Sequence, residues 1–196
     1  MLPPPFDRIR AILAQRPVGQ ITELPPELFP VKRAASVLVP LFLRGGAPFL
    51  VLTQRTEHLA LHAGQISFPG GGRDEDDRDE LATALREAEE EIGLAPSAAE
   101  VLGPLDRLDT VTGFRVSPFV AAIPEGYAYR PQAEEVAAIL ELPLAAFLEP
   151  GALQTEEREV FGALRRIYGY TVQGHLVWGA TGRIVKNLLE AIAPAL

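Results

Sequence analysis

The chain has 196 residues, 47% of them hydrophobic, which is typical of one globular domain with a substantial core. It contains no cysteine, which excludes a disulfide framework, a thiol nucleophile and a cysteine-ligated zinc site. A net charge of −8 argues against a nucleic-acid-binding surface, and the longest near-apolar run, residues 34–43, is too short to span a membrane.

The N-terminal segment is predicted to begin with a helix and to continue as a proline-rich lead-in. Residues 6–15 carry apolar side chains at helical spacing, and residues 17–31 are rich in proline and predict irregular structure. The segment lacks the apolar core of a signal peptide. We therefore expect a soluble cytoplasmic protein, with one domain over residues 1–196 whose helix and lead-in occupy residues 1–33.

The next elements are predicted to be strands. Residues 34–44 and 49–55 are rich in valine and leucine and are joined by a Gly-Gly-Ala-Pro turn, which indicates a hairpin. Pro40 cannot donate a backbone hydrogen bond, so it is expected to mark a bulge or a sheet edge. Residues 65–68 predict a short strand that leads into a glycine-rich turn.

Residues 68–94, FPGGGRDEDDRDELATALREAEEEIGL, are the part of the sequence around which the rest is organised. The glycine turn is followed by an acidic loop and then by a predicted helix over about residues 79–92. Gly93 follows the last helical residue, as a C-cap would. The apolar stripe of this helix consists of Leu81, Ala84, Leu85, Ala88 and Ile92.

The region after the helix is predicted to contain two strands and a loop. Residues 102–110 and 116–123 indicate strands around a turn at Thr112 and Gly113. Residues 124–133 indicate a loop. Residues 135–142 alternate poorly, so the pattern alone leaves helix and strand open.

The C-terminal region is predicted to contain a hairpin and a helix. Residues 144–147 suggest one helical turn. Residues 165–172 and 175–178 indicate two strands joined by Gln173-Gly174, a favourable two-residue turn. Residues 180–193 predict a helix with Thr181 as its N-cap.

Three carboxylates of the central helix are the candidate chemical groups. Glu87, Glu90 and Glu91 stand at i, i+3 and i+4 and therefore converge on one side, where like charges repel. A divalent cation would turn this repulsion into ligation, because hard oxygen ligands suit magnesium or manganese. The alternative is a solvated helix face, since glutamate is a good helix former. The glycine-rich turn at a fixed distance upstream favours the chemical interpretation.

This stretch resembles the Nudix box, G-x5-E-x7-R-E-U-x-E-E-x-G-U, where U is aliphatic. The first half departs from the pattern by one residue. Either Gly72 and Arg78 or Gly71 and Asp77 occupy its glycine and acidic positions, and we favour Gly71 and Asp77 because a carboxylate is kept. The second half matches at Arg86, Glu87, Glu90, Glu91, Gly93 and Leu94, with Ala88 in the first aliphatic position.

The resemblance implies an α/β fold, a Nudix-type α/β/α sandwich with a mixed β-sheet, and it favours a strand over residues 135–142. It also implies hydrolysis of a nucleoside diphosphate linked to another moiety. Mg²⁺ or Mn²⁺ would be held by Glu87 and Glu91 with Glu90, and a backbone carbonyl of the glycine turn, as at Gly71, would complete the shell. Glu90 is the first candidate for the general base and Glu135 the second. Arg86 is expected to orient the carboxylates.

A second motif lies directly upstream. Residues 52–71, LTQRTEHLALHAGQISFPGG, resemble the extra signature of the coenzyme A pyrophosphatase branch, L-L-T-x-R-[SA]-x3-R-x3-G-x3-F-P-G-G. Ala60 stands where that signature has arginine, so another side chain would have to supply the contact. The matching positions are Leu52, Thr53, Arg55, Gly64, Phe68, Pro69, Gly70 and Gly71. The expected substrate-binding residues are Arg55, His62, Gly64, Gln65 and Gly70.

The combined motifs imply hydrolysis of coenzyme A to 3′,5′-ADP and 4′-phosphopantetheine, or to the acyl form from an acylated substrate. Alternatives are another nucleoside diphosphate derivative, such as ADP-ribose or NADH, and a Nudix domain that binds a ligand without turnover. The expected partner is a small nucleotide, with no nucleic acid and no membrane. A homodimer, the number of ions, the identity of the base and the oxidation or acylation state of coenzyme A stay open.

Overall fold

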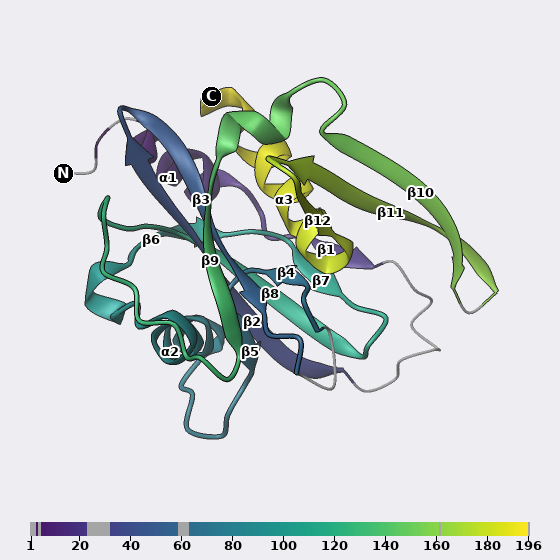
Figure 1. Cartoon of the computed structure of the whole chain (residues 1–196), viewed down its shortest axis with the longest axis horizontal. Coiled ribbons are helices and arrows are strands. Elements are labelled where there is room, and N and C mark those ends of the chain that lie inside the picture. Colours follow the sequence, from purple (N-terminus) through teal and green to yellow (C-terminus); the bar gives the residue numbers. More distant parts are fainter. Residues whose placement is uncertain (1–2, 4, 23–31, 59–62, 161, 196) are drawn as a thin grey trace.

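A computed structural model describes residues 3, 5–22, 32–58, 63–160 and 162–195 (Figure 1). In these residues the chain forms a nine-stranded sheet, a separate three-stranded sheet and three α-helices. The large sheet consists of β1 (Gln20–Thr22), β2 (Arg33–Arg44), β3 (Ala47–Arg55), β4 (Ile66–Ser67), β5 (Gly70–Gly72), β6 (Glu100–Pro104), β7 (Arg107–Asp109), β8 (Phe114–Ala122) and β9 (Val136–Pro143).

Strand β2 is the centre of the large sheet. From Arg33 to Leu41 it pairs in parallel with β8. On its other side it pairs antiparallel first with β5 and then, nearer its end, with β3. Strand β3 continues the sheet to β9 and β4, and β8 continues it to β6, β7 and β1. The sheet is therefore mixed, as the resemblance implied.

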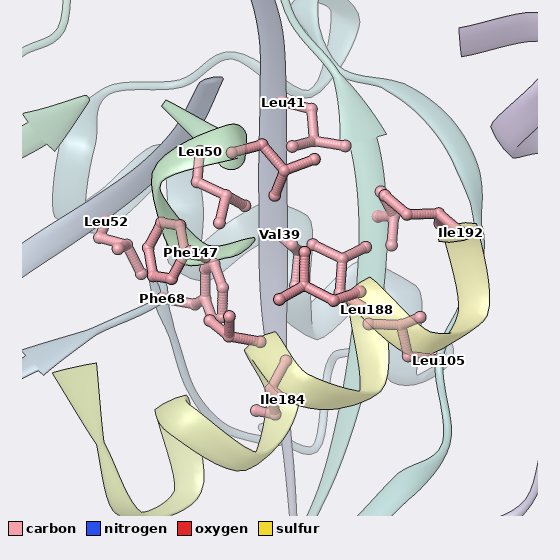
Figure 2. Close-up of a cluster of buried hydrophobic side chains, with 14 of the residues drawn as sticks. Val39, Leu41, Leu50, Leu52, Phe68, Leu105, Phe147, Ile184, Leu188 and Ile192 are labelled. Atoms are coloured by element: carbon pink, nitrogen blue, oxygen red, sulfur yellow. The ribbon is translucent and has the colours of Figure 1, made fainter. Parts of the chain in front are cut away.

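Helices cover both faces of this sheet (Figure 1). Helix α2 (Glu80–Ile92) packs on one face, where Leu38 and Phe42 of β2 point. Helices α1 (Phe6–Gln15) and α3 (Gly179–Ile192) pack on the other, where Val39 and Leu41 point (Figure 2). The strand serves both cores because its side chains alternate between the two faces. The predicted α/β/α sandwich is confirmed.

The second sheet is a three-stranded antiparallel ribbon of β10 (Leu153–Val160), β11 (Ala163–Val172) and β12 (His175–Trp178). Its β10–β11 end projects away from the sandwich (Figure 1). The predicted β11–β12 hairpin is confirmed, and Gln173 and Gly174 both have the positive φ that a type I′ turn requires. Strand β10 was not predicted.

Most of the remaining elements match the sequence pattern. The first helix, the β2–β3 hairpin, the short strand β4 and helix α2 lie where they were expected, and residues 136–143 form a strand. Short 3₁₀ segments occur at η2 (Pro96–Ala98), η3 (Leu144–Leu148) and η4 (Ala193–Ala195), and η3 is the expected single turn. None of the helices in the described part of the chain is long and apolar enough to cross a membrane.

Four local predictions were wrong. Residues 102–110 contribute to two strands, because β6 ends at Pro104 and β7 begins at Arg107, and each pairs with a different part of β8. Part of the proline-rich segment forms β1, which pairs with β7, while residues 23–31 lie outside the described residues. The glycines expected to form a turn form strand β5 instead. Thr181 is not the N-cap of α3, because the helix begins at Gly179 after Trp178.

Pro40 lies in the central strand and not at an edge. The backbone N–H of Leu38 bonds to the Pro69 carbonyl on the β5 side, and pairing with β3 starts only at Leu41. Pro40 thus occupies the position at which β2 changes partners. Its missing N–H removes no ladder hydrogen bond there, which explains why the sheet tolerates it.

Candidate active site

Helix α2 is capped at both ends, which fixes the residues at which it begins and ends and hence where its glutamates lie. Asp79 caps its N-terminus by accepting a hydrogen bond from the Ala82 N–H at 2.8 Å. Gly93 ends it with φ 67°, the left-handed conformation expected of a glycine C-cap. Between the caps, Ala84, Ala88 and Ile92 are fully buried against the sheet, which brings Glu87 and Glu91, on the adjoining flank of the helix, next to β5.

Arg86 connects most of the acidic groups of the site. It donates two hydrogen bonds to Asp77, at 3.0 and 3.1 Å, and one to Glu90 at 2.8 Å. The Nη2 atom, which makes the longer of the two bonds to Asp77, also lies 3.0 Å from both Glu87 Oε1 and the Gly72 carbonyl oxygen. The bond from Arg86 lowers the pKa of the buried Asp77 to about 2. Arg86 therefore contacts the carboxylates of Asp77, Glu87 and Glu90 directly.

The contact of Asp77 with Arg86 also distinguishes the two alignments of the motif. Asp77 is buried beneath the guanidinium, whereas the side chain of Arg78 is 77% exposed and pairs with Asp79. The structure thus places the carboxylate of the favoured alignment beside the helix.

Glu91 is the most deeply buried acid of the site. Only 5% of the residue is exposed, and its Oε2 atom has no hydrogen-bond partner among the described residues. Burial raises its pKa to about 8; the negative charges of Glu87 and Glu135 add to this effect, while Arg55 and the Gly70 N–H oppose it. Burial also raises the pKa of Glu87, against the effect of Arg86. A cation that binds Glu91 would therefore displace a proton from it.

The glycines of β5 allow the backbone to approach these carboxylates closely. A Cβ atom on Gly71 would lie 2.5 Å from the carboxylate carbon of Glu87, and one on Gly70 would lie 2.4 Å from the Ser36 carbonyl oxygen. Only glycine fits both positions without displacing a neighbour. The β5 backbone consequently lies directly against the Glu87 side chain.

Arg55 and Glu135 approach the same carboxylates from β3 and β9. Nitrogens of Arg55 lie 3.9 Å from Glu91 and 4.0 Å from Glu135. The position of Glu135 is fixed by its backbone, because its carbonyl accepts a hydrogen bond from Thr56. The preceding loop is tied to the end of α2 by a 2.9 Å bond from Gln132 N to the Glu91 carbonyl.

A pocket of about 480 Å³ lies beside β5, on the face of the sheet that carries α3. Arg55, Gln65, Gly70 and Gly71 of the predicted site line it. The remaining lining is mostly apolar and includes Trp178 at the start of α3. This composition suits the organic part of a ligand whose polar end reaches the glycine strand.

Gly64 is the one predicted binding residue in the described part of the chain that does not line this pocket. Gly64 has φ 69°, and a Cβ atom there would lie 2.4 Å from a carboxylate oxygen of Glu57, so its local role is that of a turn. His62 lies outside the described residues, as does Ala60, the departure from the upstream signature.

Comparison with known proteins agrees with this geometry. The profile of the NUDIX domain matches residues 32–164. The chain belongs to the Nudix family. It is 44% identical over 156 residues to the Escherichia coli K12 protein named "Uncharacterized Nudix hydrolase NudL", covering 80% of this chain and 81% of the relative. The chain is accordingly a Nudix hydrolase, and members of this family generally use divalent metal ions.

Solved structures support the Nudix fold. A mutT/nudix family protein from Listeria innocua superimposes with a TM-score of 0.54 at 19% identity, over 84% of this chain and 96% of that one. A MutT/nudix family protein from Enterococcus faecalis gives 0.53 at 13% identity, over 99% and 76%. At such identities the likeness concerns the fold alone.

The Nudix helix has a donor set that fits a hard divalent cation. Within the described ranges, no three acidic or histidine side chains already meet as a closed cation cage. Glu91 nevertheless offers a buried oxygen without a hydrogen-bond partner, and Glu87 stands against the Gly71 backbone. Carboxylate and carbonyl oxygens are the ligands that magnesium and manganese prefer.

Sequence reasoning missed the part of this Nudix site that comes from distant segments. Trp178, at the end of β12, and Phe114, in β8, line the pocket and were not singled out. Trp178 is the only tryptophan of the chain and directly precedes a glycine that starts a helix, which is the one signal that could have drawn attention to it. Phe114 carries no such signal.

Proposed function

We propose that this Nudix hydrolase cleaves the pyrophosphate bond of coenzyme A or a derivative, with Mg²⁺ or Mn²⁺, to 3′,5′-ADP and 4′-phosphopantetheine or its acyl form. The observation that carries the proposal is the pair of buried carboxylates, Glu87 and Glu91, facing a glycine strand at the edge of a largely apolar pocket. Buried acids with raised pKa values weaken the fold unless a ligand compensates them, so their presence favours catalysis over passive binding.

Glu87 and Glu91 would hold the cation, together with Glu90 and the backbone of Gly71. When bound, the cation neutralises phosphate charge and acidifies a water molecule. The protein's own residues keep these oxygens in place. Arg86 holds Glu87 and Glu90, and the missing Cβ of Gly71 leaves room for the Glu87 carboxylate.

Proton removal from the attacking water is assigned to Glu90 first and to Glu135 second. The side chain of Glu90 is 58% exposed, so solvent reaches it, and the bond from Arg86 at 2.8 Å holds its direction. Glu135 is 41% exposed and lies on the far side of Arg55. A Glu90→Gln variant should lose about 10²–10⁴-fold in kcat, the usual contribution of general base catalysis, while Glu135→Gln should lose less. A larger loss in kcat for Glu135→Gln than for Glu90→Gln would assign the role of general base to Glu135.

The choice of coenzyme A is supported by the upstream signature and by where its residues lie. Arg55, Gln65 and Gly70 line the pocket, and Arg55 also lies 3.9 Å from Glu91, so a pyrophosphate bound beside Arg55 would be near the carboxylates. The pocket beyond them has room for an organic arm and few charged groups. ADP-ribose and NADH remain the competing substrates, and a ligand sensor without turnover is the competing class of function.

The deciding experiment is a substrate panel with products identified by mass. Coenzyme A, an acyl-coenzyme A, ADP-ribose, NADH and dinucleoside polyphosphates are incubated with the protein and Mg²⁺ or Mn²⁺. We expect 3′,5′-ADP from coenzyme A, and no product in the presence of a chelator. Turnover of ADP-ribose without turnover of coenzyme A would replace the substrate. Binding without any turnover would support the sensor.

A further inference from the structure

A second groove adjoins the active-site pocket and shares two residues with it, Gly72 and Phe114. Gly72 belongs to the glycine strand and accepts a hydrogen bond from Arg86, so the groove begins next to the catalytic carboxylates. Its other walls include two arginines, Arg33 and Arg73. They lie close together because the Arg73 N–H bonds to the carbonyl of Ala34, the residue after Arg33.

Arg33 has a guanidinium held in place without a carboxylate. It lies over the Phe114 ring, 4.1 Å from the ring centroid. Among the described residues, no acid pairs with it. Stacking on an aromatic face orients the planar guanidinium and leaves its N–H donors directed sideways. An anion in the groove would therefore meet a donor that has already lost much of its rotational freedom.

Arg73 is held in a similar way. It donates to the Asp77 carbonyl at 3.0 Å and to the Arg78 carbonyl at 3.4 Å, and it too pairs with no carboxylate in the described part of the chain. Arginine has five donors, so donors remain for a ligand. In a chain of net charge −8, two neighbouring arginines without an acid partner are unexpected unless they serve an anion.

Two acids, Asp74 and Glu75, also line the groove. Asp74 lies 3.8 Å from Arg86, which draws it toward the catalytic carboxylates. The groove consequently has no strong net positive field. Recognition here has to come from directed guanidinium hydrogen bonds, which favour a compact tetrahedral anion such as a phosphate over diffuse negative charge.

We propose that Arg33 and Arg73 form a subsite for a phosphate monoester on the nucleotide half of the substrate, which in coenzyme A is the 3′-phosphate. The inference rests on the proposed function, because it places the pyrophosphate at the glycine strand. It adds the basis for discrimination: coenzyme A carries this third phosphate, and ADP-ribose and NADH lack it. The subsite would supply the arginine–phosphate contact that is lost because Ala60 replaces the arginine of the signature.

The test is a comparison of two nucleotides that differ only in the 3′-phosphate. Binding of 3′,5′-ADP and 5′-AMP is measured by calorimetry on the full-length Glu91→Gln variant at one Mg²⁺ concentration, so that the 5′-phosphate contributes equally to both. We expect 3′,5′-ADP to bind at least about tenfold tighter, since a single hydrogen bond between charged groups changes the affinity by about that factor. Equal affinities would overturn the subsite without any further variant.

Variants in the groove then assign the preference. Arg33→Gln and Arg73→Gln should each bring the affinity ratio toward one while leaving 5′-AMP binding unchanged. Arg33→Lys should keep part of the preference, because it keeps the charge and loses the planar fork. Arg8→Gln, at an exposed arginine of α1 without an ion pair among the described residues, is the control for net charge. An equal loss for both nucleotides would mean that the arginines contact the base or the 5′-phosphate, which contradicts the subsite.

Hydrolysis of coenzyme A and 3′-dephospho-coenzyme A separates this inference from the proposed function. If both are hydrolysed with equal kcat/KM, the subsite fails and the pyrophosphatase stands. If neither is hydrolysed, the proposed function fails, and the nucleotide affinity ratio still decides the subsite.

Discussion

Glu91 combines three properties at the residue scale: it is buried, it bears a strongly raised pKa, and one of its oxygens has no partner in the described chain. Such a group weakens the fold in the absence of a ligand. It is retained at a site only if its charge is used there. Stability and activity should accordingly respond in opposite directions when this charge is removed.

We therefore expect Glu91→Gln to stabilise the protein in chelator at pH 7 by about 1–3 kcal/mol, because an amide avoids the cost of burying a carboxyl with a raised pKa. The same variant should lose at least about 10³-fold in kcat. Urea unfolding and steady-state kinetics measure the two effects. Glu89→Gln, on the exposed side of the same helix, is the matched control and should change neither. A destabilised variant with full activity would contradict the assignment.

The Asp77–Arg86 pair predicts a defined pH dependence of stability. The pKa of Asp77 is lowered from 3.8 to about 2 by the hydrogen bond from Arg86. A lowered pKa in the folded state contributes stability above the unfolded value, and this contribution is lost as the pH falls from about 4 to about 2. Its size is on the order of 2 kcal/mol.

Asp77→Asn should consequently be less stable than the parent chain at pH 7, and the difference should shrink across that acid window. The free energy of unfolding, measured in urea between pH 2 and pH 7, reports this. Asp76→Asn is the control, since Asp76 is exposed. A difference that stays constant down to pH 2 would show that the effect of Asp77 is not electrostatic.

At the scale of elements, strand β5 and helix α2 pack so closely that β5 has no room for a side chain at Gly71. Gly71 faces the Glu87 carboxylate, whereas a Cβ atom on Gly72 would meet nothing within 4 Å. The two neighbouring glycines thus allow a controlled comparison. A side chain at position 71 would displace Glu87, whereas a side chain at position 72 would have free space.

Gly71→Ala should displace the Glu87 carboxylate and weaken Mn²⁺ binding by about tenfold or more, as expected when a ligand is moved from its place. Gly72→Ala should leave the Mn²⁺ affinity within about twofold of the parent. Titration of Mn²⁺ followed by electron paramagnetic resonance measures both. Equal affinities in the two variants would remove Glu87 from the ion site.

The elements also show how far the sequence pattern reaches. Helix α2, its glycine cap and the Gln173-Gly174 hairpin were predictable because their signals are local. Strand β10 was missed because its residues are almost all exposed and mostly polar or charged, so that no alternation exists to detect. Pairing partners decided the other errors: β1 forms because β7 lies beside it, and the 102–110 segment divides because β6 and β7 pair with different parts of β8.

At the scale of the whole molecule, the acidic cluster and the N-terminal helix lie on opposite faces of the sheet. Helix α2 carries the carboxylates on one face, while α1 packs on the other with Ile9 fully buried. Ile9 is not among the residues that line the pocket, so its truncation should lower stability with little effect on the site. We also propose that residues 1–196 unfold as one domain.

Ile9→Ala should lower the free energy of unfolding by about 2–5 kcal/mol, the usual cost of truncating a fully buried isoleucine. Below its unfolding temperature, kcat should stay within about twofold of the parent. Ile12→Ala, where the same side chain is only partly buried, should cost less. Differential scanning calorimetry should show one transition in each protein. Two separate transitions would contradict a single domain.

The site was predictable in proportion to how much of it is contiguous in sequence. Glu87, Glu90 and Glu91 share one helix, so their spacing alone indicates a cluster. Phe114, Trp178 and Arg33 come from segments up to 145 residues apart and meet only because β2 lies beside β8 and α3 begins at the pocket. No local pattern encodes such a meeting, since it depends on the pairing of the whole sheet.

The burial of Glu91 has a consequence for the lifetime of the protein in a cell. A cation that binds only the folded chain adds to its stability in proportion to the logarithm of its free concentration. When the supply of the ion falls, the enzyme would become both inactive and easier to unfold, and proteases act on the unfolded fraction. Abundance would then follow ion supply through turnover of the polypeptide, with no dedicated regulator.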